Sequence, residues 1–136
     1  MSLNWAKPNH NHASEYQVAG WPYVTASACD ATPKRIEFPQ TTQWFQLKVN
    51  KGSGGGGADI KLGFTSKGVS DGFHYLVENS DKAPSITPVF HVKCKEIWVA
   101  ATAAGPVSFS LMAGLTNVTG SDFPVITGSN GFGGVG

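Results

Sequence analysis

Two alternations of apolar and polar residues, joined by a glycine-rich run, constrain the fold more than any other feature. They cover residues 41–49 and 58–64, on either side of the run 52–57. The apolar members are Phe45, Leu47, Val49, Ile60, Leu62 and Phe64. Because successive side chains of a strand point to opposite faces, each segment predicts a strand with one apolar face. Since glycine readily adopts positive φ, the run suits a connection between paired strands. We therefore predict a β-hairpin over residues 41–64, whose apolar face needs a second layer to cover it.

Short strands are also expected on either side of this hairpin. Gly and Pro cut most of the chain into pieces too short for a typical helix. The additional expected strands are 23–28, 35–38, 73–77, 88–94, 96–99 and 107–111. Residues 89–104 contain neither Gly nor Pro and also fit one helical face, so a helix there is the open alternative. The pattern predicts an all-β chain, an antiparallel β-sandwich of jelly-roll type.

The two ends of the chain lack a usable period. Aromatic residues lie among Asn, Ser and Ala near the N-terminus, and apolar residues lie among glycines near the C-terminus. We therefore divide the chain into an N-terminal arm (residues 1–22), a β-sandwich (residues 23–115) and a C-terminal arm (residues 116–136). Ordering such an arm costs conformational entropy that packing on itself does not recover. Both arms are expected to extend from the sandwich and lie against another surface.

Large apolar and aromatic residues in the arms and on the outer strand faces are candidates for partner contact. They are Trp5, Tyr16, Trp21, Trp44, Trp98, Phe123, Ile126, Phe132 and Val135. Trp44 and Trp98 are expected on faces opposite the core. Trp is enriched at the centres of protein interfaces, which favours a subunit contact for both. A sugar-stacking platform, as in sandwich lectins, is the alternative, and it would make the chain a carbohydrate-binding module.

Residues with catalytic or metal-binding chemistry form no recognisable motif in the sequence. His10 and His12 would lie on one side of an extended chain, but a metal site normally needs three or four ligands. His91 and Cys94 would face opposite sides of a strand, which prevents a nucleophile–base pair. A buried thiol is expected at Cys94, and a bridge to Cys29 stays open. We expect no enzymatic activity, no cofactor and no metal, with His10 and His12 as weak metal candidates.

The charge and the hydropathy pattern narrow the classes of partner. Charged residues make up 14% of the chain and the formal net charge is +1. Clustered Lys and Arg, which bind phosphates, are missing from the sequence, so nucleic acid is not an expected partner. The sequence also shows neither a basic-then-apolar leader nor an apolar run long enough for a bilayer, so neither secretion nor membrane insertion is expected.

Five segments give the chain a resemblance to a known family. They are SEYQ (residues 14–17), GWPYVT (20–25), LGFT (62–65), FSLMAGLT (109–116) and FPVITGSNGFGGVG (123–136). With these segments the chain resembles a family of small virion structural proteins of tailed bacteriophages, common in aquatic phages. The resemblance implies a non-enzymatic protein located in the virion. A capsid decoration (cement) protein is the first expectation, and a neck, tail or baseplate component is the alternative.

The same resemblance implies the partners. The major capsid protein or other virion subunits would be contacted by the arms, which would stabilise the shell. A homo-oligomer is expected, and decoration proteins in general suggest a trimer. Because each arm loses entropy on ordering, many weak contacts repeated by symmetry would have to compensate.

Overall fold

The computed structural model describes residues 19–50, 58–79, 85–103, 106–124, 126 and 134. The strands within these ranges are β1 (Trp21–Cys29), β2 (Lys34–Glu37), β3 (Gln40–Val49), β4 (Ile60–Gly63), β5 (Tyr75–Val77), β6 (Ser85–Ile86), β7 (Glu96–Ala101) and β8 (Val107–Thr119). A short helix α1 (Ser66–Ser70) follows β4, and a 3-10 turn η2 (Gly120–Asp122) follows β8. No helix in the described ranges has the length and apolarity needed to cross a membrane.

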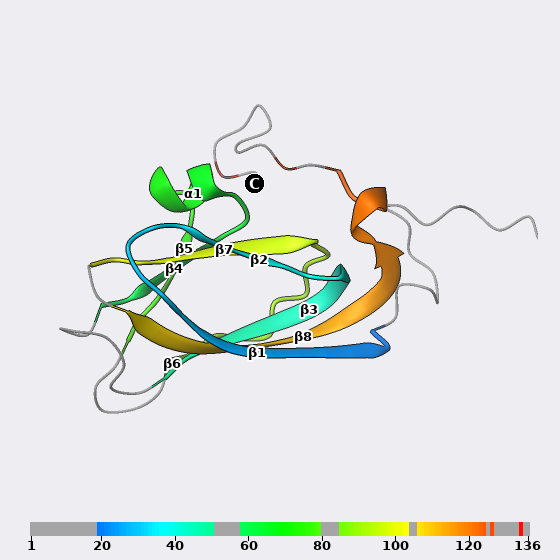
Figure 1. Ribbon diagram of the computed structural model, residues 1–136, viewed down its shortest axis with the longest axis horizontal. Coiled ribbons are helices and arrows are strands. Elements are labelled where there is room, and N and C mark those ends of the chain that lie inside the picture. The colour runs from blue at the N-terminus through cyan, green and yellow to red at the C-terminus, as the bar shows by residue number, and fades with distance from the viewer. Residues whose placement is uncertain are drawn as a thin grey trace, which may run out of the picture.

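The strands form two four-stranded antiparallel sheets that stack in two layers (Figure 1). The first sheet has the strand order β1-β8-β3-β6, and the second has the order β2-β7-β4-β5. Helix α1 lies on the outer side of the second sheet. The prediction of a mostly β chain with antiparallel sheets around one core is confirmed.

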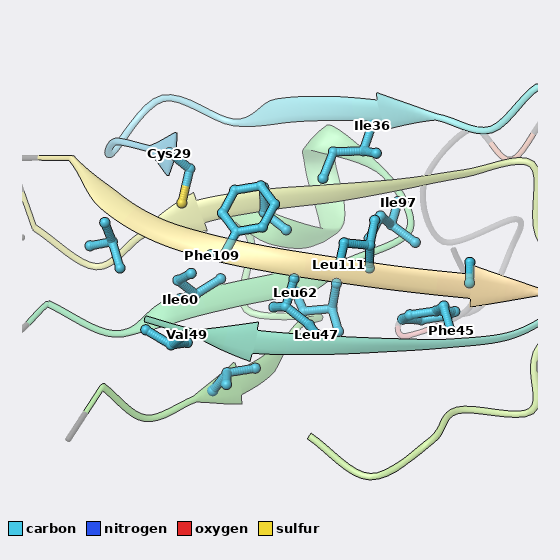
Figure 2. Close-up of a cluster of buried hydrophobic side chains, with 14 of the residues drawn as sticks. Cys29, Ile36, Phe45, Leu47, Val49, Ile60, Leu62, Ile97, Phe109 and Leu111 are labelled. Atoms are coloured by element: carbon cyan, nitrogen blue, oxygen red, sulfur yellow. The ribbon is translucent and has the colours of Figure 1, made fainter. Parts of the chain in front are cut away.

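The core is filled by the inward-facing residues of both sheets (Figure 2). Strand β8 runs through the middle of the first sheet and supplies Phe109 and Leu111, which are 0% and 2% exposed. Their partners across the β3 pairing are Val49 and Leu47. The facing layer comes from the second sheet, with Ile60, Leu62, Ile97 and Val99. Burying each such side chain contributes about 1.5–3 kcal/mol, so this layer dominates the stability.

The predicted hairpin over residues 41–64 is wrong, although its alternation is right. Phe45, Leu47, Val49, Ile60 and Leu62 are all buried. However, β3 pairs with β8 and β6 in the first sheet, whereas β4 pairs with β5 and β7 in the second. The two strands face each other across the core instead of lying side by side. An alternating pattern reports only that one face is buried, and it fits both arrangements equally well.

Strand β8 passes the predicted end of the sandwich at residue 115. It continues to Thr119, and both Thr116 and Val118 are 0% exposed. Thr116 is buried because its Oγ1 donates to the Thr41 carbonyl at 2.9 Å and accepts from the Val118 N–H at 3.2 Å. Burial of a hydroxyl costs much less free energy when the hydroxyl is hydrogen-bonded. Because this stretch contains polar residues, the sequence did not indicate that it belongs to a core strand.

The first strand likewise begins inside the predicted N-terminal arm. β1 starts at Trp21, so that residue and Pro22 belong to the first sheet. Just before the strand, the Gly20 N–H donates to the Leu115 carbonyl at 3.0 Å, and the Ala19 N–H donates to Gln43 Oε1 at 3.2 Å. The part of the predicted arm from residue 19 to 22 is therefore fixed on the sandwich itself.

The segment 87–94 follows the edge of β3 as an interrupted strand, where a regular strand over 88–94 was predicted. It touches β3 at intervals: Phe90 forms an isolated bridge with Phe45, and Thr42 bonds the backbone of Cys94. Thr42 Oγ1 also donates to the Val92 carbonyl at 2.8 Å. The alternative of one helix over residues 89–104 is wrong, since residues 96–101 form β7.

Helix α1 forms the connection between β4 and β5. Its N-cap is Thr65, whose side chain accepts from the Gly68 N–H at 2.9 Å, the usual role of Thr at this position. Val69 is 1% exposed because it packs down on Gly63 of β4. A Cβ on Gly63 would lie 2.8 Å from Val69 Cγ2, so the missing side chain lets the helix sit against the sheet.

Candidate interaction surfaces

The outer face of the first sheet exposes several large apolar side chains, and none of the helices or strands that the structure describes covers it (Figure 1). Since Phe109 and Leu111 face the core, their neighbours on β8 face outward. Among the outward residues of this sheet, Val24 is 70% exposed, Ile86 is 58% exposed and Met112 is 46% exposed. We call this surface the bare face. Large apolar side chains gathered on one exposed face indicate a contact surface.

Strand register places the bare face in two rows. The first row runs across three strands as Val24, Met112 and Gln46, and the second runs across four as Ala26, Ser110, Lys48 and Ile86. These side chains line a shallow hollow of about 460 Å³. Lys48 brings the positive charge to these rows, and its aliphatic stem can lie along apolar surface while the ammonium stays in water. The hollow suits another protein surface better than a charged small molecule.

One end of the same sheet is covered by Trp44. Its indole lies over Gly114, the cross-strand partner of Trp44 on β8. A Cβ on Gly114 would overlap the indole Nε1 and lie 2.7 Å from the Cβ of Ala19. The half-buried Trp44 therefore closes this end by occupying the space that a side chain on β8 would fill. Beside it, Trp21 stays 58% exposed, while its indole N–H donates to Asn117 Oδ1 at 2.9 Å.

The structure does not bring Trp44 and Trp98 together. Trp98 belongs to β7 in the second sheet, where its cross-strand partners are Arg35 and Gly63. Since Ile97 and Val99 face the core, Trp98 points outward on the side opposite to the bare face. The two indoles lie on opposite sides of the sandwich and form no common sugar-stacking platform.

The second sheet carries charges on its outer face. Arg35 forms an ion pair with Glu96 on the neighbouring strand and a second one with Glu37, at 3.5 Å. Glu37 and Glu96 are direct cross-strand partners, a placement in which like charges repel. The guanidinium of Arg35 offsets this repulsion by binding both carboxylates. This face is thus charged and partly covered by α1, unlike the bare face.

A second apolar surface lies where loops meet the edge of the sandwich. We call it the aromatic groove, a hollow of about 410 Å³ whose main side chains are Phe45, Phe64, Phe73, Tyr75, Phe90 and Val92. The Phe90 ring lies 5.2 Å from the Phe45 ring and 5.4 Å from the Tyr75 ring. Sequence reasoning missed this groove because its residues come from segments far apart in the chain. Only the exposed aromatics between α1 and β5 could have indicated it.

The aromatic groove also contains a buried polar atom without a partner. Nδ1 of His74 is shielded from solvent, and within the described structure no hydrogen-bonding group reaches it. Phe73 and Tyr75, on either side of His74, are 46% and 52% exposed. A buried, unpaired ring nitrogen costs free energy, which a donor entering the groove would recover.

Both cysteines are free and buried, as expected for Cys94. Burial raises the pKa of Cys29 to about 11, against a smaller lowering by nearby Lys34. Burial also raises the pKa of Cys94 to about 11, while its contact with Thr42 Oγ1 at 3.3 Å lowers it slightly. Since the thiolate is the reactive form, both thiols are unreactive at neutral pH. His91 is exposed, so it does not join Cys94 in the core.

The remaining predicted contact residues lie near or beyond the end of β8. Phe123 and Ile126 are half-buried, and the Phe123 carbonyl accepts from Lys95 Nζ at 3.5 Å. The other predicted residues, Trp5, His10, His12, Tyr16, Phe132 and Val135, lie outside the described residues. In the part of the chain that is described, no group of three or more His, Cys, Asp or Glu side chains is placed to hold a metal ion.

Neither a protein-family model, nor a curated protein, nor a solved structure matches the chain. The resemblance to phage virion proteins therefore stays a prediction.

Proposed function

We propose that this chain is a jelly-roll domain acting as a non-enzymatic structural protein of a tailed-phage virion, specifically a capsid decoration protein. The observation that carries the proposal is the bare face, an uncovered apolar surface on a rigid β body. Its exposed members Val24, Ile86 and Met112 lie on three different strands that hydrogen bonding holds in one sheet. Such a preformed surface suits docking on a folded partner with little loss of entropy.

The strand pairing supports the jelly-roll classification. β1 pairs with β8, β2 with β7, β3 with β6 and β4 with β5, as in one long hairpin of eight strands. Additional pairs, β3 with β8 and β4 with β7, then gather this ribbon into two sheets. Eight-stranded jelly rolls recur in viral capsid proteins, lectins and cupins. A fold by itself does not indicate a function. The proposed function therefore rests on the bare face and on the family resemblance.

The proposed partner is the major capsid protein or another virion subunit. Contact through the bare face would be extended by the N-terminal arm, which enters the first sheet at Trp21 beside Trp44. Because the symmetry of a shell repeats the same contact many times, the overall binding would be strong even if each single contact is weak. Self-association into a trimer is part of the proposal, and its only support is that decoration proteins in general suggest it.

The position of the protein in purified particles tests the proposal directly. Cryo-electron microscopy is expected to show density of this two-sheet shape on the outer surface of the capsid shell. Density at the neck, tail or baseplate would replace the decoration role by one of those structural roles. Particles without the protein, together with binding of the isolated chain to a glycan array, would favour a carbohydrate-binding module and contradict the proposal.

A loading assay on particles stripped of the protein tests the surface. Val24→Asp places a charge at the most exposed apolar position of the bare face, and loading is expected to fall at least tenfold. The matched control is Ser70→Asp, which adds the same charge at an exposed position on α1 and should load normally. Equal loading by both variants would show that the bare face is not the contact.

A further inference from the structure

The aromatic groove has no role in the contact proposed for the bare face. It lies between residues of both sheets, since Phe45 belongs to β3 and Leu62 to β4, and it opens beside Phe73 and Tyr75. Its apolar walls include buried Phe45 and half-exposed Phe73 and Tyr75, and Nδ1 of His74, which has no partner in the described structure, is buried. A site of this kind suits a segment that supplies apolar side chains together with backbone N–H groups.

One residue of the chain's own C-terminal segment lies at this groove. Gly134 lines it together with Tyr75 and Val92. Its φ is +93°, a conformation that residues with a side chain rarely adopt, so the backbone turns at the groove. From Phe123, whose carbonyl meets Lys95, the chain to Gly134 can span up to roughly 35 Å, about the width of a small domain. The tether is therefore long enough to reach the groove within one molecule.

We propose that residues 127–136 occupy the aromatic groove of their own chain, with Phe132 and Val135 as the apolar anchors. These two side chains flank Gly134 in the sequence, so the segment brings apolar groups to the place where Gly134 lies. The glycines between them let the backbone approach the aromatic walls closely, and a backbone N–H supplies the donor for His74 Nδ1. The C-terminal segment then completes its own subunit, and contact with the shell is left to the bare face and the N-terminal arm. This inference does not depend on the virion role.

A spin label on the full-length protein tests the proposal. Gly136→Cys provides the attachment site and leaves both anchors in place, and Cys29 and Cys94 stay unlabelled because they are buried with raised pKa values. Paramagnetic broadening in the NMR spectrum is expected at the amides of Phe73 and Tyr75, at least severalfold greater than at the bare face. Broadening that is absent from the groove, or equal on the groove and the bare face, would overturn the proposal.

Two controls make the result specific. A label at Val24→Cys should broaden the bare face and leave the groove sharp. Mixing labelled chain with an excess of isotope-labelled, spin-free chain should leave the groove of the spin-free copies sharp. Broadening there would assign the groove to a neighbour's segment and overturn the intramolecular proposal. In the chain labelled at position 136, Phe132→Ala should weaken docking about tenfold or more, and Met112→Ala on the bare face should leave it unchanged.

Discussion

On the outer face of each sheet, a glycine lies beneath a bulky side chain, but the two sheets differ in how much of the face is covered. On the second sheet, Gly63 lies beneath Val69 of α1, and an entire helix covers the strand. On the first sheet, Gly114 lies beneath the single side chain of Trp44. The second sheet is thus covered by an element of secondary structure, whereas the first is covered by a single side chain.

This difference shows which face the chain completes by itself. Around Gly63 the outer face of the second sheet is partly covered by α1 and carries charges, as at Arg35, although Leu76 on the edge strand β5 is 46% exposed. Beyond Trp44 the first sheet exposes Val24 and Met112. The first sheet leaves more apolar surface open than the second, as expected of a partner-binding face. The two sides of β8, and the two glycines, should therefore respond differently to substitution.

The largest effect is expected from neighbouring residues on opposite sides of β8. Leu111→Ala opens a cavity in the core and should cost about 2–5 kcal/mol of unfolding free energy. Met112→Ala, one residue later on the bare face, should change it by less than about 0.5 kcal/mol. Urea denaturation followed by circular dichroism measures both. A loss above about 1 kcal/mol for Met112→Ala would mean that the face is covered in solution and would remove the contrast.

The two glycines should give the next largest effect. Gly114→Ala forces the Trp44 indole aside and Gly63→Ala pushes on Val69, and each should cost about 1–3 kcal/mol. The two glycines differ in what lies over them, a single side chain at Gly114 and a helix at Gly63. Trp44 is a single half-buried side chain, so Gly114→Ala should cost clearly less in a Trp44→Ala background, as a double-mutant cycle by urea denaturation would show. Strictly additive costs would mean that Trp44 does not cover Gly114.

The inward and outward sides of most strands could be predicted from the sequence. The alternation at Phe45, Leu47 and Val49 reports burial locally, and the structure places these residues in the core. Strand partners could not be predicted in the same way. Which strand lies beside β3 depends on β8, some sixty residues later in the chain, and no local pattern encodes that pairing.

The candidate surfaces were predictable only in part. Exposed aromatics such as Trp21 could be named from the sequence, but Trp44 and Trp98 were expected to share a role and lie on opposite sheets. The end of β8 was missed because Thr116 is polar, and its burial depends on a hydrogen bond to Thr41, which is distant in the sequence. The aromatic groove was missed for the same reason, since its walls come from several segments that are far apart in the sequence.

A smaller effect is expected from the cap of the covering helix. Thr65→Ala removes the acceptor for the Gly68 N–H and should cost about 1 kcal/mol. Since α1 covers only the second sheet, hydrogen exchange should quicken around Gly63 while the amides of β8 keep their protection apart from the global loss. Thr65→Ser keeps the acceptor and serves as the matched control. Equal loss of protection in both sheets would show that the helix is not a separate cover.

The smallest effect, and the sharpest test of the bare face, is expected from Val24→Thr. Threonine keeps the β-branched shape, so the strand itself should be unaffected, and the unfolding free energy should change by less than about 0.5 kcal/mol. Retention on a hydrophobic interaction column should nevertheless fall, because Val24 is the most exposed of the large apolar side chains in the described structure. The control Val99→Thr places the same hydroxyl in the core, where it should destabilise the fold by at least about 1 kcal/mol.

A different outcome would contradict an open bare face. If Val24→Thr left retention unchanged while the loss of unfolding free energy that it causes grew with protein concentration, a second copy of the chain would be covering this face. The contrast between the two sheets would then lie between a face covered by a helix and a face covered by another subunit.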